Sequence, residues 1–315
     1  MRTTSPFRIL GYLAVALGVV VPCGSAYAFS HENSGEPIQV PVADSTGHQW
    51  LMQGRVCRPV GKTLSRLVII NHGSPASSKD RPGMTLASCE SESVQWFVHR
   101  HYAVVLVLRL GYGATGGPWS EGYGGFDSAN FVRAGLETAR QIQAVVDYSV
   151  TLPQADPTGV IVVGQSAGGW GTVAYDSVAH PHVAAFINMA GGRGGHYRDQ
   201  RDSNCHPEKL VAAAAEYGKT ASTPMLWIYS KNDSFFNTEL ASSMYEAYTR
   251  GGGTAAFITA RSFGTDGHHL FGGRGGSEIW GPILAAYIDK VDPVGSVAND
   301  GRSRNQTVGV HNPAY

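Results

Sequence analysis

Charged side chains are scarce in this chain, where they make up 15% of 315 residues. The 24 basic and 24 acidic residues balance, so the formal net charge is +0 with histidine neutral. Proteins that bind nucleic acid or an anionic membrane surface through charge carry a basic excess. The sequence therefore predicts no nucleic-acid partner. Its hydrophobic share of 43% is enough for a sizeable core.

Cysteine is also rare, with Cys23, Cys57, Cys89 and Cys205 as the four examples. Their wide spacing excludes a zinc knuckle, and the 12 histidines contain no H-E-x-x-H motif, so we expect no metal site. Cys23 lies in an N-terminal segment that we expect to be removed. In an oxidising compartment the other three would form one disulfide and leave one free thiol. The sequence does not choose the pair.

The N-terminal segment has the pattern of a secretory signal peptide. Arg2 and Arg8 give a positive start, residues 9–21 form an uncharged apolar run, and A-Y-A at residues 26–28 offers small residues for cleavage. The run is too short for a comfortable membrane span, and an uncleaved anchor is the alternative. We predict removal of residues 1–28 and an exported protein, periplasmic or secreted, with no stable membrane span after cleavage.

Strand patterns alternate with helix patterns along the rest of the chain. Short apolar runs rich in β-branched residues predict strands, and apolar positions at helical spacing predict helices. This alternation gives crossover units on a mostly parallel central sheet flanked by helices, with the strands buried on both faces. Two β-like runs are expected within residues 39–60, and further strands at residues 66–71, 103–108, 160–163, 183–189, 225–229 and 255–260. Helices are expected at residues 91–100, 128–150, 167–180, 207–217, 238–250 and 278–291.

One α/β domain accounts for this pattern. No change of composition divides residues 29–291. Residues 292–315 are polar and poor in large apolar side chains, which is typical of a flexible C-terminal tail. Residues 191–222 are longer than a tight connection requires, so we expect a small lid-like insert there.

The strongest motif is G-Q-S-A-G at residues 164–168, which matches G-x-S-x-G. It lies between a predicted strand and a predicted helix. A sharp turn there holds the serine in a strained backbone conformation that only small residues two positions away allow. The turn lifts the hydroxyl of Ser166 above the sheet, beside the first helical N–H groups, which favour negative charge. Ser166 is therefore the candidate nucleophile.

A serine hydroxyl is a weak nucleophile until a base removes its proton. We expect the base on a loop past the last strand, and His268 and His269 both lie there. The spacing does not separate these two histidines.

The acid that orients the base should leave the carboxyl edge of a strand, where the sites of open α/β sheets lie. Asp233 follows the strand predicted at residues 225–229 and fits this position. Its carboxylate would hold the tautomer of the imidazole and stabilise the imidazolium. Glu239 and Asp266 are the rivals. Glu239 is expected inside the next helix, and Asp266 is too near the histidines to aim across at a ring.

Attack on a carbonyl creates an oxyanion that needs N–H donors. The backbone N–H of Ala167, directly after the nucleophile, is one candidate. The backbone N–H of Ser74, on the loop after the strand at residues 66–71, is the other. His72, on the same loop, is expected to be structural because a base is already found elsewhere.

Three further residues are candidates for contact with the substrate. Gly73 allows its backbone to approach a ligand closely, and Gln165 is the direct neighbour of the nucleophile. Arg193 lies in G-G-R-G-G at residues 191–195 and would meet an acidic group if that loop borders the site.

The chain resembles the exported, dienelactone hydrolase-like branch of the α/β-hydrolase superfamily over about residues 57–287. The likeness rests on N-H-G-S-P at residues 71–75, G-Q-S-A-G-G-W at 164–170, L-W-I-Y at 226–229 with N-D-S-F-F at 232–236, and D-G-H-H-L-F at 266–271.

This resemblance implies an α/β-hydrolase fold and a triad of Ser166, Asp233 and His268, because the base in such sequences directly follows Asp-Gly. It also implies hydrolysis of an ester or lactone without a cofactor. Dienelactone hydrolase proper uses a cysteine nucleophile, so the serine here favours general ester substrates over lactones.

The expected function is cleavage of a small-molecule carboxylic ester through an acyl-enzyme. A serine peptidase or an acyltransferase on the same fold is one alternative, because a fold alone does not separate these activities. A non-catalytic binding protein that retains the fold is another. The sequence does not indicate the oligomeric state.

Overall fold

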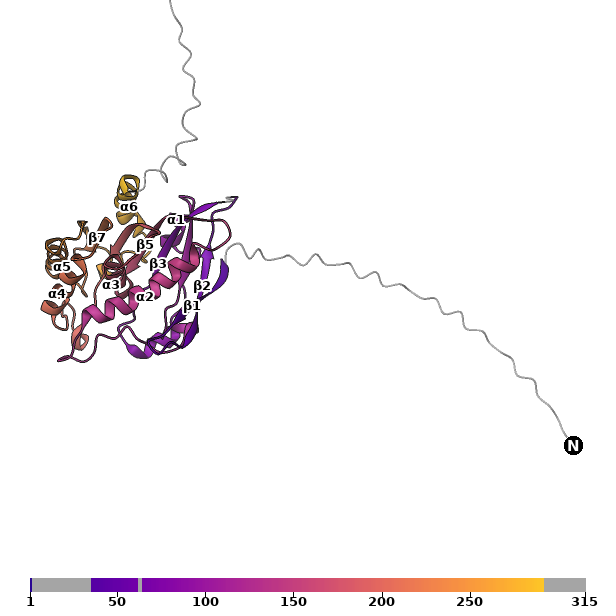
Figure 1. The fold of residues 1–315 in the computed structure, drawn as a ribbon, viewed down its shortest axis with the longest axis horizontal. Coiled ribbons are helices and arrows are strands. Elements are labelled where there is room, and N and C mark those ends of the chain that lie inside the picture. Colours follow the sequence, from indigo (N-terminus) through magenta and orange to yellow (C-terminus); the bar gives the residue numbers. More distant parts are fainter. Residues whose placement is uncertain (2–34, 62–63, 292–315) are drawn as a thin grey trace, which may run out of the picture. The chain divides into compact units, whose positions relative to one another are not determined.

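An eight-stranded sheet forms the centre of the part of the chain that the computed structural model describes, which is residue 1, residues 35–61 and residues 64–291. The predicted signal peptide (residues 1–28) and tail (residues 292–315) lie outside the described residues. The strand order is β1-β2-β4-β3-β5-β6-β7-β8 (Figure 1). The strands are β1 Glu36–Ala43, β2 Gln49–Cys57, β3 Ser65–Asn71, β4 Tyr102–Val107, β5 Ala155–Gln165, β6 Val183–Met189, β7 Met225–Ser230 and β8 Ala255–Ala260.

The sheet is mostly parallel, which confirms the prediction. β1 pairs antiparallel with β2, and β2 antiparallel with β4. The other neighbouring strands pair parallel. The carboxyl ends of β3, β5, β6, β7 and β8 therefore meet at one edge, where an α/β sheet carries its site.

Helices connect and cover the strands. They are α1 Glu92–Val98, α2 Phe131–Ser149, α3 Ala167–Asp176, α4 Pro207–Gly218, α5 Thr238–Gly251 and α6 Ser277–Val291. Among the described residues, no helix has both the length and the apolar character needed to cross a membrane.

The start of α2 shows how a local contact sets a boundary. The sequence predicts this helix from residue 128, but it begins at Phe131. The side-chain oxygen of Asn130 accepts a hydrogen bond from the backbone N–H of Arg133 at 2.8 Å. Such a cap satisfies one of the N–H groups that the first turn leaves free, so the helix starts after Asn130.

The central strands β3, β4, β6 and β7 are largely buried on both faces, as their continuous apolar runs predict, whereas β1, β2 and β8 nearer the sheet edges are partly exposed. In β3, Leu67 and Ile69 pack in the core cluster that contains side chains of α2, α3, α4 and α5. Val68 and Ile70 pack in the cluster that contains side chains of α1 and α6. Successive residues of a strand point to opposite faces, so the sheet separates two cores and its carboxyl edge is held rigidly.

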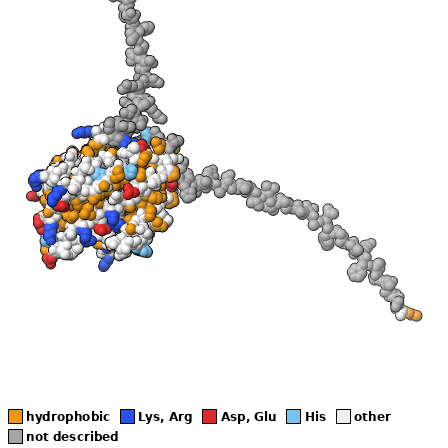
Figure 2. Space-filling model, in the orientation of Figure 1, with side chains coloured by type: hydrophobic (Ala, Val, Ile, Leu, Met, Phe, Trp, Pro, Cys, Tyr) orange, Lys and Arg blue, Asp and Glu red, His pale blue; other side chains and the backbone are white. Residues whose placement is uncertain are grey.

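Charges of both signs share the surface. Over the face that Figure 2 shows, Lys and Arg side chains are interspersed with Asp and Glu. This distribution agrees with the balance of basic and acidic residues in the sequence.

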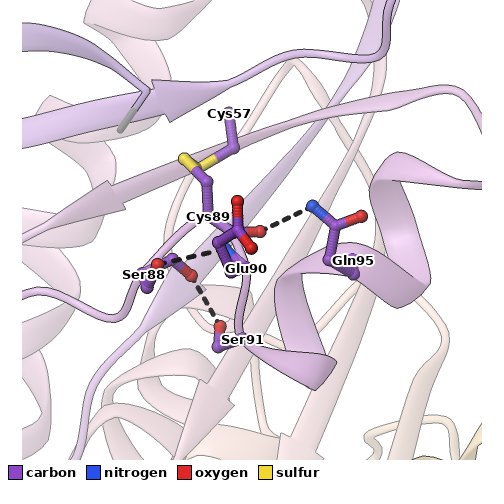
Figure 3. The surroundings of a disulfide bond; sticks show 6 residues. All are labelled: Cys57, Ser88, Cys89, Glu90, Ser91 and Gln95. Carbon is purple, nitrogen blue, oxygen red and sulfur yellow. Dashed lines mark hydrogen bonds between the residues drawn. A yellow bond between two sulfur atoms is a disulfide. The ribbon is translucent and has the colours of Figure 1, made fainter. Parts of the chain in front are cut away.

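A disulfide joins Cys57 at the end of β2 to Cys89, which lies three residues before α1 (Figure 3). The structure thus makes the choice that the sequence leaves open, and Cys205 is free and buried. The backbone carbonyl of Cys89 also accepts a hydrogen bond from Nε2 of Gln95 at 2.7 Å. The disulfide therefore attaches the end of the segment between β3 and α1, which begins with the Ser74 loop, to strand β2 of the sheet.

Loss of this disulfide should destabilise the fold. The two cysteines are 32 residues apart, and closing a loop of that length constrains the unfolded chain by about 3–4 kcal/mol in the chain-entropy account. The double variant Cys57→Ala/Cys89→Ala should lose free energy of unfolding of this order in urea titrations. Reductant should lower the stability of the wild type and of Cys205→Ala by a similar amount and leave the double variant unchanged. Equal stability of the wild type with and without reductant would contradict this prediction.

Candidate active site

Ser166 lies at the sharp turn between β5 and α3. Its backbone has φ 55° and ψ −119°, a conformation that non-glycine residues rarely adopt. A Cβ on Gly164 would lie 2.3 Å from the carbonyl oxygen of Gly168, and one on Gly168 would lie 2.5 Å from the carbonyl oxygens of Asn71 and His72. The chain can make this turn only because both positions are glycine.

The structure brings Ser166, His268 and Asp233 into one hydrogen-bonded row. Nε2 of His268 lies 2.9 Å from Oγ of Ser166, and Nδ1 lies 3.1 Å from each carboxylate oxygen of Asp233. A carboxylate only accepts, so Nδ1 carries the proton and donates it to Asp233. Nε2 is then free to accept the proton of the serine hydroxyl. This arrangement can make the hydroxyl nucleophilic.

All three side chains are shielded from water. Their exposed fractions are 8% for Ser166, 5% for His268 and 1% for Asp233. Oδ1 of Asp233 also accepts from the backbone N–H groups of Phe235 and Phe236, at 2.9 and 3.0 Å. These two bonds fix the carboxylate, so it can aim at Nδ1.

His269 and Asp266 line the large cavity as well, but neither joins the hydrogen-bonded row. His269 is exposed, and its ring centroid is 6.1 Å from that of His268. The carboxylate of Asp266 accepts from the backbone N–H groups of Ser234 and His268, both at 3.1 Å, so it holds the loop and not the ring. Glu239 lies in the first turn of α5. Of these candidates, His268 and Asp233 are the ones whose side chains lie within hydrogen-bond distance of each other, and the imidazole of His268 also lies within that distance of Ser166.

The two candidate oxyanion donors border the same cavity as Ser166. Ala167 is the first residue of α3, where helical N–H groups have no partner within the helix. Ser74 follows Gly73, and a Cβ on Gly73 would lie 3.0 Å from Cβ of Ser166 and 2.7 Å from Oε1 of Gln165. The glycine thus lets the Ser74 loop pass directly beside the nucleophile.

The side chain of Gln165 is hydrogen-bonded to the loop that carries His268. Its Nε2 donates to the backbone carbonyl of His268 at 3.1 Å. It also lines the larger of two cavities beside Ser166, together with Gly73. Contact of either residue with a substrate stays a prediction.

A buried ionic cluster supports the Ser74 loop. The hydroxyl of Tyr112 lies 3.0 Å from Oγ of Ser74 and 3.0 Å from the carboxylate of Glu121. Glu121 pairs with the guanidinium groups of Arg109 and Arg193. Burial opposes the ionisation of Glu121, but the two arginines outweigh it and lower its pKa to about 2. The carboxylate therefore stays charged and anchors Tyr112 under the loop.

Arg193, predicted to meet an acidic group of a substrate if its loop borders the site, lies beside the small cavity but is paired inside the protein. Its side chain is only 5% exposed. Nη2 donates to Glu121 at 2.7 Å and to Oγ1 of Thr138 at 2.9 Å. The guanidinium is thus committed to the buried cluster because a buried charge needs a partner, although Arg193 does line the smaller cavity.

His72 is a structural residue of the same loop. Its Nε2 accepts from the backbone N–H of Arg109 at 3.1 Å, and its Nδ1 lies 2.6 Å from the carbonyl oxygen of Gly73. Desolvation by burial, together with the charge of Arg109, lowers the pKa of His72 to about 3. His72 is therefore neutral in the folded protein, with Nδ1 as donor.

Acidification should destabilise the protein through His72. The unfolded chain takes up a proton here near the ordinary histidine pKa of about 6.5, but the folded chain resists until about pH 3. Stability from this group is therefore complete above pH 6.5 and falls as the pH drops below it, at up to about 1.4 kcal/mol per pH unit. Urea unfolding at a series of pH values should show this slope as a difference between the wild type and His72→Gln. Parallel pH curves for the two proteins would contradict the prediction.

Two cavities meet at Ser166. The large cavity has a volume of about 750 Å³, and the small cavity of about 210 Å³. Ser74, Pro75, Ala76, Ser166 and Phe235 line both. Apolar side chains make up much of the wall of the large cavity: Ile70, Met84, Leu86, Leu106, Leu108 and Phe271. A site of this size and character fits the hydrocarbon part of a small organic molecule.

The segment predicted as a lid-like insert, residues 191–222, divides into two parts. Residues 192–195 line the small cavity, and His196 lines the large one. The second part holds α4, which packs against α2, α3 and α5 as a crossover helix. A lid could therefore involve only the part that precedes α4.

Some neighbours of the site carry no simple sequence signal. The ring of Phe235 stacks on His268 with centroids 4.2 Å apart, and that of His196 stacks on Phe235 at 3.5 Å. Phe235 is two residues after Asp233 and could be found from that proximity. His196 lies within the predicted lid-like insert, three residues after Arg193, but no motif singles it out, so its stacking is seen only in the fold.

No three His, Cys, Asp or Glu side chains converge as metal ligands within residues 35–61 and 64–291.

The sheet order, the turn at Ser166 and the position of the site define the class of fold, and the comparisons name it. The chain has the α/β-hydrolase fold. Acylaminoacyl peptidase of Pyrococcus horikoshii matches with a TM-score of 0.56 and 18% identity, over 81% of this chain and 41% of that one. This chain thus spans less than half the length of the peptidase.

Two smaller solved proteins match over most of both chains. An esterase of Pyrococcus furiosus has a TM-score of 0.54 and 14% identity, over 91% of this chain and 96% of that one. Est1E of Butyrivibrio proteoclasticus, with ferulic acid bound, has a TM-score of 0.54 and 14% identity, over 81% and 98%. No model of a protein family and no curated protein matches the chain.

Proposed function

We propose that this protein is a serine hydrolase that cleaves carboxylic esters of small molecules through an acyl-enzyme. The observation that carries the proposal is the row from Asp233 through His268 to Ser166, with contacts of 3.1 and 2.9 Å. Such a row activates a serine on several unrelated folds. Here it lies at the carboxyl edge of the sheet, beside two cavities that can hold the parts of a substrate.

Acylation begins with Ser166. Its Oγ attacks the ester carbonyl while Nε2 of His268 takes the hydroxyl proton. The negative charge that develops on the carbonyl oxygen is stabilised by the backbone N–H groups of Ala167 and Ser74 and by the N-terminal end of α3. His268 then gives its proton to the leaving alcohol, and the acyl group stays on Ser166.

Deacylation repeats these steps with water. His268 takes a proton from a water molecule that attacks the acyl carbon, and the acid leaves as Ser166 regains its proton. Asp233 keeps Nδ1 protonated and stabilises the imidazolium that forms in both halves of the reaction.

The lining of the large cavity supports an ester with a hydrocarbon part. Met84, Leu86 and Phe271 offer an apolar surface against which such a part can pack. Polar residues such as Thr85, Ser93 and His269 line the same cavity, so the choice between an ester and a peptide substrate rests on the assay below. The same machinery would also accept a lactone.

An exported location is part of the proposal. The signal pattern of residues 1–28 motivates it, and the Cys57–Cys89 disulfide supports an oxidising compartment such as the periplasm or the cell exterior.

A panel of chromogenic esters of graded acyl length, run beside matched anilides, tests the function. Turnover of esters should exceed that of anilides and should fall for acyl chains that outgrow the large cavity. Faster cleavage of peptide anilides would favour a peptidase. Folded protein that neither turns over any ester nor reacts with a fluorophosphonate would favour a binding protein.

A further inference from the structure

A second set of contacts lies beside the row of Ser166, His268 and Asp233. The rings of His196 and Phe235 are nearly parallel, at 11° and 3.5 Å between centroids. Phe235 in turn stacks on His268 at 24° and 4.2 Å. The plane of the His268 ring is therefore supported by a stack that ends at His196.

Hydrogen bonds connect the same residues by another route. Nε2 of His196 lies 2.7 Å from Oγ of Ser234, which donates its own proton to the carboxylate of Asp266. Because that hydroxyl proton is used, Ser234 accepts from His196, and Nε2 of His196 is the donor. The other oxygen of Asp266 accepts the backbone N–H of His268 at 3.1 Å. His196 is thus linked to the ring of His268 through Phe235, and to its backbone through Ser234 and Asp266.

The segment around His196 is held in a costly conformation. Residues 195 and 204 form an isolated β-bridge, and residues 196–203 between them form a short loop that we call the excursion. Left-handed backbone is unfavourable for non-glycine residues, and it persists only where surrounding contacts impose it. Four residues of the excursion have positive φ: His196 (54°), Arg198 (57°), Asp199 (60°) and Asp202 (58°).

The contacts that impose this conformation lead to the site. The backbone N–H of Asp202 donates to the carbonyl of Ser234 at 2.8 Å, and Nη1 of Arg201 lies 3.4 Å from Asp266. Together with His196, these residues attach the excursion to the two loops that carry Asp233 and His268.

We propose that His196 is a positioning residue for the reaction of Ser166. The ring stack holds the imidazole of His268 in the plane that its two hydrogen bonds require, and the hydrogen bond to Ser234 holds the excursion in place. This inference rests on the proposed function. Small displacements of a catalytic group raise the barrier strongly, because attack depends on close alignment. His196 also lines the large cavity, so a positioning role is distinguished from substrate contact by a loss in kcat that exceeds the change in KM.

The test compares wild type, His196→Ala and His196→Asn in ester turnover and in the rate of covalent labelling by a fluorophosphonate. For His196→Ala we expect kcat and the labelling rate to fall together by about tenfold or more, with KM changing much less. Asparagine tolerates left-handed backbone and keeps an N–H donor, so His196→Asn should recover part of the loss. His99→Ala, an exposed histidine after α1, is the matched control and should behave as the wild type.

Folded His196→Ala with kcat and labelling within twofold of the wild type would overturn the proposal, as would a loss that appears in KM alone. If His196→Ala does not fold, Phe235→Leu removes the ring that stacks between His196 and His268 and must show the same joint loss. Wild-type protein that neither labels nor turns over esters would instead refute the proposed function itself.

Discussion

Replacement of Ser166 by alanine should lower kcat for ester hydrolysis by about 10⁴-fold or more and abolish covalent labelling by a fluorophosphonate. The physical reason is the loss of Oγ, the atom 2.9 Å from Nε2 of His268 and the only one that could carry the acyl group in the proposed mechanism. The backbone turn depends on the glycines at 164 and 168, so the variant should fold. Circular dichroism and thermal unfolding check the fold, and single-turnover assays check the chemistry.

A matched serine sharpens this test. Ser93 is buried and lines the large cavity, but it lies in α1, away from the hydrogen-bonded row. Ser93→Ala should keep both labelling and turnover. Labelling of Ser166→Ala at the wild-type rate would place the nucleophile on another residue.

Replacement of His268 by alanine should also cost about 10⁴-fold in kcat, because no other base contacts Ser166 in the described part of the chain. Without an acceptor for its proton, the hydroxyl remains a weak nucleophile. His269→Ala removes the neighbouring imidazole, which is exposed and lines the large cavity, whereas the imidazole that lies 2.9 Å from Oγ of Ser166 is that of His268.

The pair of histidine variants makes the comparison direct, because both side chains leave the same short loop. We expect kcat of His269→Ala within a few-fold of the wild type in the same ester assay. The reverse order of effects, with His269→Ala inactive and His268→Ala active, would show that the loop rearranges when substrate binds.

The sequence predicts well what depends on local sterics. The strain at Ser166 and the lack of room at residues 164 and 168 follow from a strand that turns directly into a helix. Five consecutive residues are therefore enough to predict the turn. The mostly parallel sheet is predicted for a similar reason, because strands buried on both faces need continuous apolar runs.

Choices between neighbours could not be made from the residues alone. His268 and His269 share a loop, and only the packing of Phe235 and the bond to Asp233 show which ring faces Ser166. The resemblance to known hydrolases was needed for that choice. The pairing of Cys57 with Cys89 could not be predicted for the same reason, because it depends on how the fold places the end of β2 beside the residues that precede α1.

Contacts between distant segments were missed altogether. Arg193 stands in a glycine-rich loop with no acidic neighbour in sequence, yet its guanidinium pairs with Glu121, 72 residues away. His196 stacks on Phe235 although 39 positions separate them along the sequence. Neither contact has a local pattern, because each depends on which loops the sheet order brings to the same edge.

The position of the free thiol bears on how the chain matures. Cys57 and Cys89 are the first two cysteines after the predicted signal peptide, and Cys205 is synthesised more than a hundred residues later. A chain that crosses a membrane from its N-terminus, as proposed here, exposes the first two to oxidant before the third arrives. The correct bridge can then form by order of emergence alone, and burial afterwards shields Cys205 from exchange with it.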